Sequence, residues 1–102
     1  MKYLIINDRK YDLIEDYKNG FDMEAVSLKL TDYFHYFDYI VGDWSYGKLR
    51  LKGFCKKENQ NYRDINDFSK KQDYIEKNCA YDCKYFVVEN LEVIQEKFKK
   101  DV

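Results

Sequence analysis

Residues 38–54 read DYIVGDWSYGKLRLKGF, and this stretch decides the fold more than any other part of the 102-residue chain. Residues 48–52 alternate strictly between cations and leucines, which is the period-two pattern of a strand with one buried face. Residues 39–41 are apolar and indicate a partner strand, and a polar, glycine-flanked loop over 42–47 joins the two. The stretch therefore predicts a β-hairpin.

A second hairpin is predicted at the start of the chain. Residues 3–6 form an apolar run that ends at Asn7 and Asp8, a pair favoured in turns. Alternating apolar residues then indicate a second strand. It ends at Asn19 and Gly20, where glycine supplies the positive φ that such turns often need.

Two amphipathic helices are also predicted. The first begins after Asp22, a suitable N-cap, and its apolar face comprises Val26, Leu30, Tyr33, Phe34 and Phe37. A polar stretch over 55–64 lacks periodicity and predicts a long mobile loop. The second helix follows it, with Ile65, Phe68, Gln72, Ile75 and Cys79 at helical spacing.

The remaining segments complete an α+β pattern. Residues 85–88 (YFVV) are typical of a buried central strand, and the tail over 91–102 has a short helical period at Leu91, Ile94 and Phe98. The order ββαββαβ(α) predicts a single α+β domain over 1–102, with a mainly antiparallel sheet of about five strands and two main helices. We expect the aromatic residues at core-facing positions to pack inside it: Tyr33, Phe34, Phe37, Phe68, Tyr85 or Phe86, and Phe98.

Composition narrows the class of protein. The net charge is -1, and the longest apolar runs are far shorter than the ~20 residues of a membrane helix. No secretory signal is visible, and three cysteines, an odd number, indicate reduced thiols rather than a disulfide framework. These features predict a cytoplasmic protein that does not enter a membrane.

Three blocks of sequence, in order over about residues 10–90, carry a resemblance to a known family: 16–21 (DYKNGF), 38–54, and 79–88 (CAYDCKYFVV). Together they resemble the YutD-like family of small proteins from Bacillus-group Gram-positive bacteria. That family typically has glycine where this chain has Ser45 and Asp82, so the turn geometry can differ there. The resemblance implies a cytoplasmic α+β domain and implies no activity.

The sequence offers little for catalysis or metal binding. It contains no P-loop, dinucleotide fingerprint, nucleophile elbow or HExxH motif, and it predicts no cofactor. One conceivable zinc set comprises Cys55, Cys79, Cys83 and His35. Its spacing argues against a structural zinc site, because only Cys79 and Cys83 form a close pair. A redox role for the cysteines would need a thiol of low pKa.

The predicted hairpin carries the strongest functional pattern. Residues 48–57 contain five cations and no acid, and alternation places Lys48, Arg50 and Lys52 on one sheet face. Trp44 and Tyr46 are expected in the adjoining loop. Cations beside ring faces suit single-stranded nucleic acid, because phosphates are neutralised while bases stack. A solvated outer face is the plain alternative, since lysine also guards strands against aggregation.

Two other functions fit the same hairpin. A protein partner could use Trp44 and Tyr46 as anchors, since Trp, Tyr and Arg are enriched at binding hot spots. A small enzyme could use Asp43 as a base in a cleft, with Tyr46 and Arg50 orienting a substrate, although an aspartate here also suits a turn. The sequence thus favours a non-enzymatic binding module, with RNA, DNA or a ribonucleoprotein first and a protein partner as the alternative.

Overall fold

The computed structural model describes residues 3–78 and 83–98. Five antiparallel strands form one sheet in the order β1-β2-β5-β3-β4. The strands are β1 (Leu4–Ile6), β2 (Arg9–Tyr17), β3 (Tyr39–Ser45), β4 (Lys48–Phe54) and β5 (Tyr85–Asn90). The two helices are α1 (Met23–Lys29) and α2 (Lys71–Asn78). The predicted α+β architecture is confirmed.

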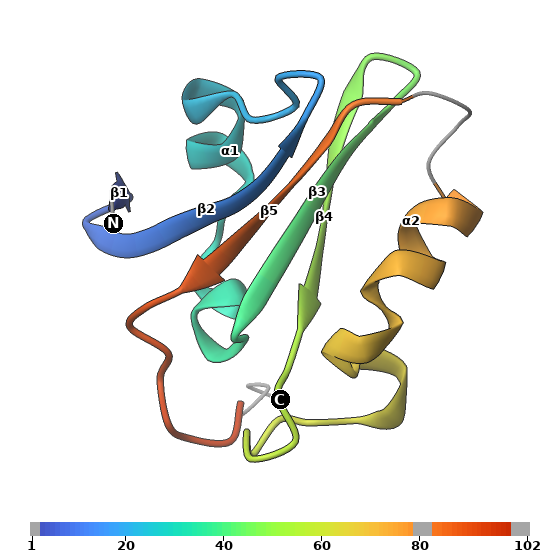
Figure 1. The fold of residues 1–102 in the computed structure, drawn as a ribbon. Helices are drawn as coiled ribbons and strands as arrows, with labels where there is room; N and C mark the ends of the chain where they lie inside the picture. Colours follow the sequence, from blue (N-terminus) through green and yellow to red (C-terminus); the bar gives the residue numbers. More distant parts are fainter. Residues whose placement is uncertain (1–2, 79–82, 99–102) are drawn as a thin grey trace.

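The two helices lie on opposite faces of the sheet (Figure 1). The core under α1 joins Val26 of the helix to Ile40 and Phe86 of the sheet, and the core under α2 joins Ile75 to Val41 and Val87. Successive residues along β3 and β5 therefore pack in different cores, one on each face of the sheet. This explains why residues 85–88 are apolar without alternation. No helix in the described ranges is long and apolar enough to cross a membrane.

The first helix is shorter than the prediction of one apolar face running to Phe37. It ends at Lys29, Thr31 is extended, and a separate 3-10 helix, η1 (Asp32–Tyr36), follows. The cause lies in another segment, because the Asn7 amide donates to the Ser27 and Leu30 carbonyls, at 3.0 and 3.1 Å. Those carbonyls are therefore satisfied without a further helical turn.

The predicted loop over 42–47 is mostly strand. β3 continues to Ser45 and β4 begins at Lys48, so the connection is the two residues Tyr46 and Gly47. Both have positive φ, at 52° and 74°, as expected for the two-residue turns that match strand twist. Gly42 is in the strand, and the position favours glycine because a Cβ there would lie 2.2 Å from the Phe86 ring.

The second helix begins later than its apolar spacing predicts. Residues 64–70 form two short 3-10 helices, η2 (Asp64–Asn66) and η3 (Phe68–Lys70), before α2 starts, and the Ile65 side chain is exposed. The loop over 55–64 is present and is fastened to the sheet end. Asn59 donates from its amide to the Asp38 carboxylate at 3.0 Å and to the Tyr36 carbonyl at 2.9 Å.

The predicted last helix is wrong for the described residues 91–98, which contain no helix. Their amides bond to other segments: Leu91 to the Lys10 carbonyl, Ile94 to the His35 carbonyl, and Phe98 to the Asn61 side chain. Phe98 is 37% exposed and Tyr33 is 46% exposed, so these two rings lie at the surface rather than in the core. Phe37 and Phe86 are buried as predicted.

Candidate functional site

Asp43 and Arg50 form an ion pair across the β3–β4 hairpin. They are cross-strand partners, and an Arg50 Nη donates to Asp43 Oδ2 at 2.6 Å. The Asp43 side chain is completely buried, whereas that of Arg50 is partly exposed. The same guanidinium donates to the Asn78 carbonyl at 2.6 Å, so Arg50 also ties the last residue of α2 to the sheet. The hydrogen bond that Arg50 donates to Asp43 raises the pKa of Arg50.

Asp43 is therefore placed as a buried partner for a cation rather than as a base in a cleft. It lines none of the three cavities near the hairpin and α2. Its second carboxylate oxygen, Oδ1, is buried and has no hydrogen-bond partner among the described residues. Burial, and secondarily the charge of Asp43, raises the pKa of the neighbouring Tyr74.

Trp44 and Tyr46 are not neighbours on one binding loop, which corrects the sequence interpretation. Trp44 belongs to β3, packs against the core under α1, and donates from its indole nitrogen to the Gly20 carbonyl at 2.7 Å. The Lys84 ammonium covers the ring at 4.7 Å from its centroid. Tyr46 is fully exposed at the turn. Of the two predicted anchors, Tyr46 is fully exposed and Trp44 is half-buried.

The predicted row of cations on β4 lies on the face opposite Trp44. Alternation places Lys48, Arg50 and Lys52 on the side of α2, since Leu49 and Leu51 contact the core under α1. Arg50 is engaged with Asp43, and the Lys52 ammonium lies 5.6 Å from the Phe54 ring centroid. Lys48 is exposed and has no ion-pair partner among the described residues. Of the three cations in the row, Lys48 thus has no ion-pair partner among the described residues, whereas Arg50 contacts Asp43 and Lys52 contacts the Phe54 ring.

β4 is an edge strand with one unpaired side. It pairs with β3, and no other strand in residues 3–78 and 83–98 pairs with it. Trp44 donates its backbone N–H to the Lys84 carbonyl, so the backbone groups of Trp44 and of every second residue of β3 point toward β5. The β4 residues opposite them therefore have N–H and C=O groups that point away from β3. Those residues are Leu49, Leu51 and Gly53.

The chain itself closes one end of this edge. Cys55 donates to the Asn66 carbonyl at 2.8 Å and accepts from the Phe68 amide at 3.2 Å, in a short parallel bridge. The hairpin turn bounds the other end. We call the unpaired stretch from Leu49 to Gly53 the β4 edge; Leu51 is half-buried in it, whereas Leu49 and Gly53 are buried.

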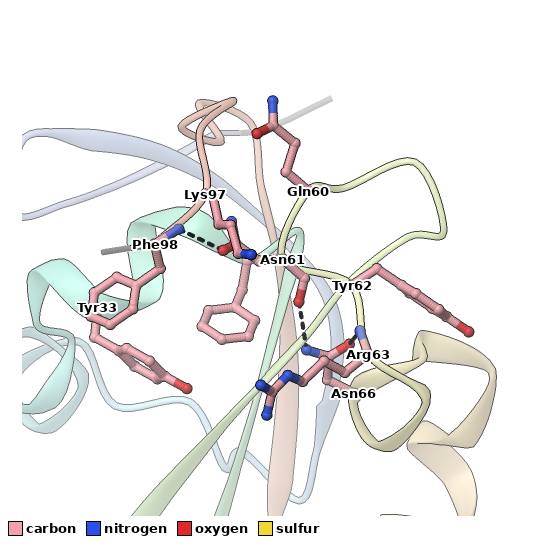
Figure 2. A pocket seen from close by; sticks show the side chains of 9 residues that line it. Tyr33, Gln60, Asn61, Tyr62, Arg63, Asn66, Lys97 and Phe98 are labelled. Atoms are coloured by element: carbon pink, nitrogen blue, oxygen red, sulfur yellow. Dashed lines mark hydrogen bonds between the residues drawn. The ribbon is translucent and has the colours of Figure 1, made fainter. Parts of the chain in front are cut away.

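One cavity lies beside the β4 edge, and a second adjoins the first. The first, here called the edge hollow, has a volume of about 210 Å³ and is lined by Leu51, Lys52 and Gly53 together with Phe34, Phe37 and Arg63. The second, the basic–aromatic pocket, has a volume of about 730 Å³ and is lined by Tyr33, Phe37, Asn61, Arg63, Lys97 and Phe98 (Figure 2). Tyr33, Phe37, Arg63 and Asn66 line both, so the two cavities adjoin.

Comparison with known proteins identifies the family of this chain. The pattern of the family described as "Putative antitoxin YutD-like" matches residues 5–89. This chain belongs to the YutD-like family.

This YutD-like chain is similar to a curated protein and to a solved structure that both carry the name YutD and both come from Bacillus subtilis. The protein named "Putative antitoxin YutD", from strain 168, is 38% identical over 88 residues, which cover 86% of this chain and 97% of the relative. The solution NMR structure of yutD from B. subtilis superposes with a TM-score of 0.73 at 33% identity. It covers 99% of this chain and 92% of the other. The resemblance read from the sequence blocks is confirmed.

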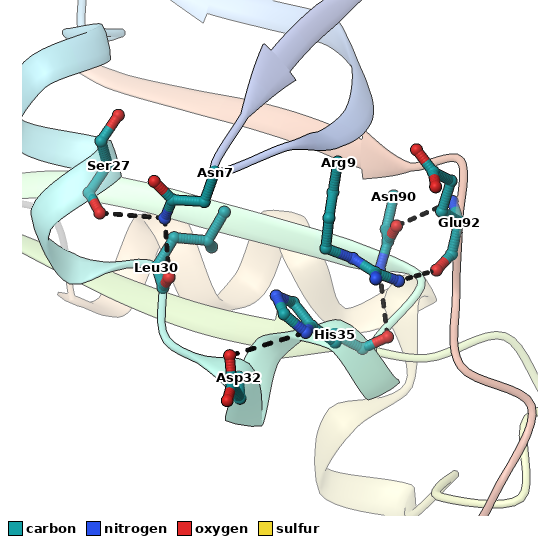
Figure 3. A network of polar contacts seen from close by, with 8 residues as sticks. All are labelled: Asn7, Arg9, Ser27, Leu30, Asp32, His35, Asn90 and Glu92. Carbon is teal, nitrogen blue, oxygen red and sulfur yellow. Dashed lines mark hydrogen bonds and ion pairs between the residues drawn. The ribbon is translucent and has the colours of Figure 1, made fainter.

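His35 sits in a structural network of this YutD-like fold (Figure 3). Its Nδ1 lies 3.9 Å from Asp32, and burial, together with the nearby Arg9, lowers its pKa. The Asn90 amide donates to the His35 and Phe37 carbonyls, at 3.2 and 3.1 Å, and Arg9 donates to the Glu92 carbonyl. The network joins the tail to η1 and to the start of β2.

The conceivable zinc set is not assembled among the residues that the structure describes, where no group of three or more metal-ligating side chains occurs. Cys55 is a free, buried thiol, as predicted, and burial raises its pKa to about 11, which disfavours a reactive thiolate. Cys83 is disulfide-bonded and offers no thiolate, so the prediction of reduced thiols is wrong for this cysteine. Cys79 lies outside the described residues.

Sequence reasoning missed Arg63, Lys97 and the rings beside them. Arg63 belongs to the stretch interpreted as a featureless loop, and Lys97 to the segment interpreted as a helix. No local pattern marks either residue, because the pocket forms only where the 60–66 loop meets η1 and the tail.

Proposed function

We propose that this chain is a protein-binding module whose partner docks along the β3–β4 hairpin by adding a strand to the β4 edge. The observation that carries the proposal is the row of outward-pointing backbone groups at Leu49, Leu51 and Gly53 on an unpaired strand. An extended segment of another protein can bond to such an edge through its main chain, while side chains give specificity.

Two further observations support a protein as the partner. The name of the B. subtilis relative, "Putative antitoxin YutD", implies a protein toxin as its partner, and here that implication is part of the proposal. Tyr46, fully exposed beside the β4 edge, is a side chain of the kind that anchors protein interfaces. The predicted cytoplasmic location agrees with such a partner.

Nucleic acid is the second candidate function, because Lys48 and Lys57 are exposed in a stretch without acids. The site is poorer for this purpose than the sequence suggests. The Trp44 ring is covered by Lys84, Arg50 is paired with Asp43, and the Lys56 ammonium lies 3.6 Å from Glu89. Few free cations and one exposed ring leave little to neutralise phosphates and stack bases.

Affinity capture from the native lysate tests the choice between these functions. The wild-type chain is compared with Tyr46→Ser/Lys48→Glu, which alters one exposed ring and one exposed cation at the hairpin. The matched control is Leu28→Ser/Lys29→Glu, which changes one exposed apolar residue and one exposed cation on α1. Capture is run with and without nuclease, and bound proteins are identified by mass spectrometry.

We expect a protein that survives nuclease treatment, is retained by the α1 control and is lost from the hairpin variant. On mixing with that partner, the Leu49, Leu51 and Gly53 amides should gain protection from hydrogen exchange. Capture abolished by nuclease would favour nucleic acid instead. Capture undiminished in the hairpin variant, with unprotected edge amides, would place the partner elsewhere and refute the proposal.

A further inference from the structure

The edge hollow lies beside the β4 residues that a strand added to β4 would face, and the basic–aromatic pocket adjoins this hollow. Leu51, Lys52 and Gly53 form part of the β4 edge and also line the edge hollow. Side chains on one face of an added strand would point toward this hollow, because successive residues of a strand alternate between faces. Whatever fills the hollow therefore belongs to the same partner segment.

The two cavities are basic and contain no acidic lining residue. Three cations line them: Lys52, Arg63 and Lys97. Within the described residues, neither Arg63 nor Lys97 forms an ion pair. A carboxylate entering between these cations would gain charge-assisted hydrogen bonds without displacing an existing partner.

The other walls are aromatic. The Tyr33 ring packs against Phe37 and Phe98, with centroids 5.0 and 5.2 Å apart, and its outer part is open to solvent. Figure 2 shows the Tyr33 and Phe98 rings on one side of the pocket and Arg63 on the other. An apolar or aromatic side chain would therefore bury surface against these rings while a neighbouring acid meets the guanidinium.

The pocket is held in shape before any partner arrives. Asn66, itself buried, accepts from the Arg63 amide at 2.8 Å and donates to the Asn61 carbonyl at 3.1 Å. Asn61 in turn accepts from the Phe98 amide at 2.6 Å. These bonds fix the loop that carries Arg63 against the tail, so a ligand need not order it.

We infer that the edge hollow and the basic–aromatic pocket recognise an acidic residue next to an apolar or aromatic residue in the extended segment of the protein partner. This inference rests on the proposed function and adds the chemistry of the segment. A peptide is favoured over a nucleic acid strand because the outward N–H and C=O groups of the β4 edge match a peptide main chain.

The test uses a random heptapeptide library displayed on phage and selected against the full chain at low salt. The consensus peptide is then synthesised with a fluorophore, and its affinity is measured by anisotropy for the wild type, Arg63→Glu and Arg63→Lys. Lys29→Glu is the control, since Lys29 is an exposed cation on α1. Amide chemical shifts of Leu51 and Gly53 report whether the peptide occupies the β4 edge.

We expect a consensus with Asp or Glu beside an apolar or aromatic residue. Arg63→Glu should weaken binding about fivefold or more, while Lys29→Glu leaves the affinity unchanged and Arg63→Lys has a smaller effect. The same library selected against Arg63→Glu should yield basic peptides instead.

Other outcomes separate this inference from the proposed function. Peptides that shift the edge amides but show no acidic preference, and bind Arg63→Glu equally well, overturn the inference and leave strand addition standing. Peptides that leave the edge amides unmoved, or a selection that enriches none, overturn the inference and count against strand addition. A thymidine decanucleotide that shifts the same amides and outcompetes the peptides would make the site a nucleic-acid groove and overturn both.

Discussion

Arg50 compensates the charge of Asp43, a carboxylate that the fold buries completely 2.6 Å from the guanidinium. A buried ion that loses its partner is strongly destabilising, because neither water nor a counter-charge replaces the contact. The pair also joins β3 to α2 through the Asn78 carbonyl. Its primary role is therefore to hold the hairpin and the helix together.

Removing the guanidinium should destabilise the protein. We expect Arg50→Met to lower the free energy of unfolding by about 3 kcal/mol, at the lower end for buried pairs because Arg50 is itself 43% exposed. Urea unfolding followed by circular dichroism measures the change. Lys48→Met, at the exposed position two residues earlier, should change it by less than about 0.5 kcal/mol. Adding Asp43→Asn to Arg50→Met should recover part of the loss, and a loss equal to that of Lys48→Met would contradict this role.

Substitutions at Trp44 and Tyr46 should affect different properties: protein stability at Trp44 and partner binding at Tyr46. Trp44→Phe removes the hydrogen bond to the Gly20 carbonyl and should cost about 1 kcal/mol of unfolding free energy. Tyr46→Ser removes an exposed side chain and should leave the denaturation midpoint unchanged while weakening partner capture. Chemical denaturation and capture measured on both variants check this division. The reverse result would restore Trp44 as a binding anchor.

Gly42 and Gly47 of the hairpin should differ sharply in how well they tolerate substitution. Gly42→Ala places a Cβ 2.2 Å from the Phe86 ring, an overlap that should cost about 1–3 kcal/mol or more. At Gly47, where a Cβ would have open space and φ is 74°, Asn should be tolerated because it adopts this region readily. Thermal unfolding of Gly42→Ala and Gly47→Asn compares them. Equal melting temperatures would show that the Phe86 ring yields to the added carbon.

Cys55 should make stability fall at alkaline pH. Burial, assisted by the nearby Asp38 charge, raises the pKa of its thiol from 9.0 to about 11. Between these pH values the unfolded chain releases the proton and the folded chain keeps it, so rising pH favours unfolding by about 1.4 kcal/mol per pH unit. Below pH 9 the thiol contributes no slope.

Comparison with Cys55→Ala isolates this contribution, because tyrosines and lysines also titrate in the same range. Urea unfolding from pH 8 to 11 should give a steeper decline for the wild type than for Cys55→Ala. Parallel curves would mean that the thiol ionises equally in both states.

The parts of the fold that sequence predicts well are those decided by local pattern. The alternation of residues 48–52 requires a strand with a buried leucine face, and the structure has β4 there. The break after α1 was not predictable in this way, because Asn7, twenty or more residues away, satisfies the carbonyls at the helix end. The apolar period through Phe37 persists across the break, so periodicity alone could not reveal it.

The candidate site likewise has parts that local sequence pattern predicts and parts that it does not. Lys48, Arg50 and Lys52 share a face as alternation requires, yet nothing local shows that Arg50 is engaged by Asp43 or that Trp44 is turned inward by Gly20. Arg63 and Phe98 come together only through contacts between segments 35 residues apart. Pockets built from such contacts carry no signature in a single sequence.

The bridge between Cys55 and Asp67 gives the open side of β4 a fixed length. With the turn at Tyr46 and Gly47 at the other end, about five residues, or roughly 17 Å of strand, remain available. A segment that adds a strand here, as proposed, can therefore pair over only these residues, whatever its own length. The fold thus confines the proposed strand addition to the short stretch between the hairpin turn and the Cys55–Asp67 bridge.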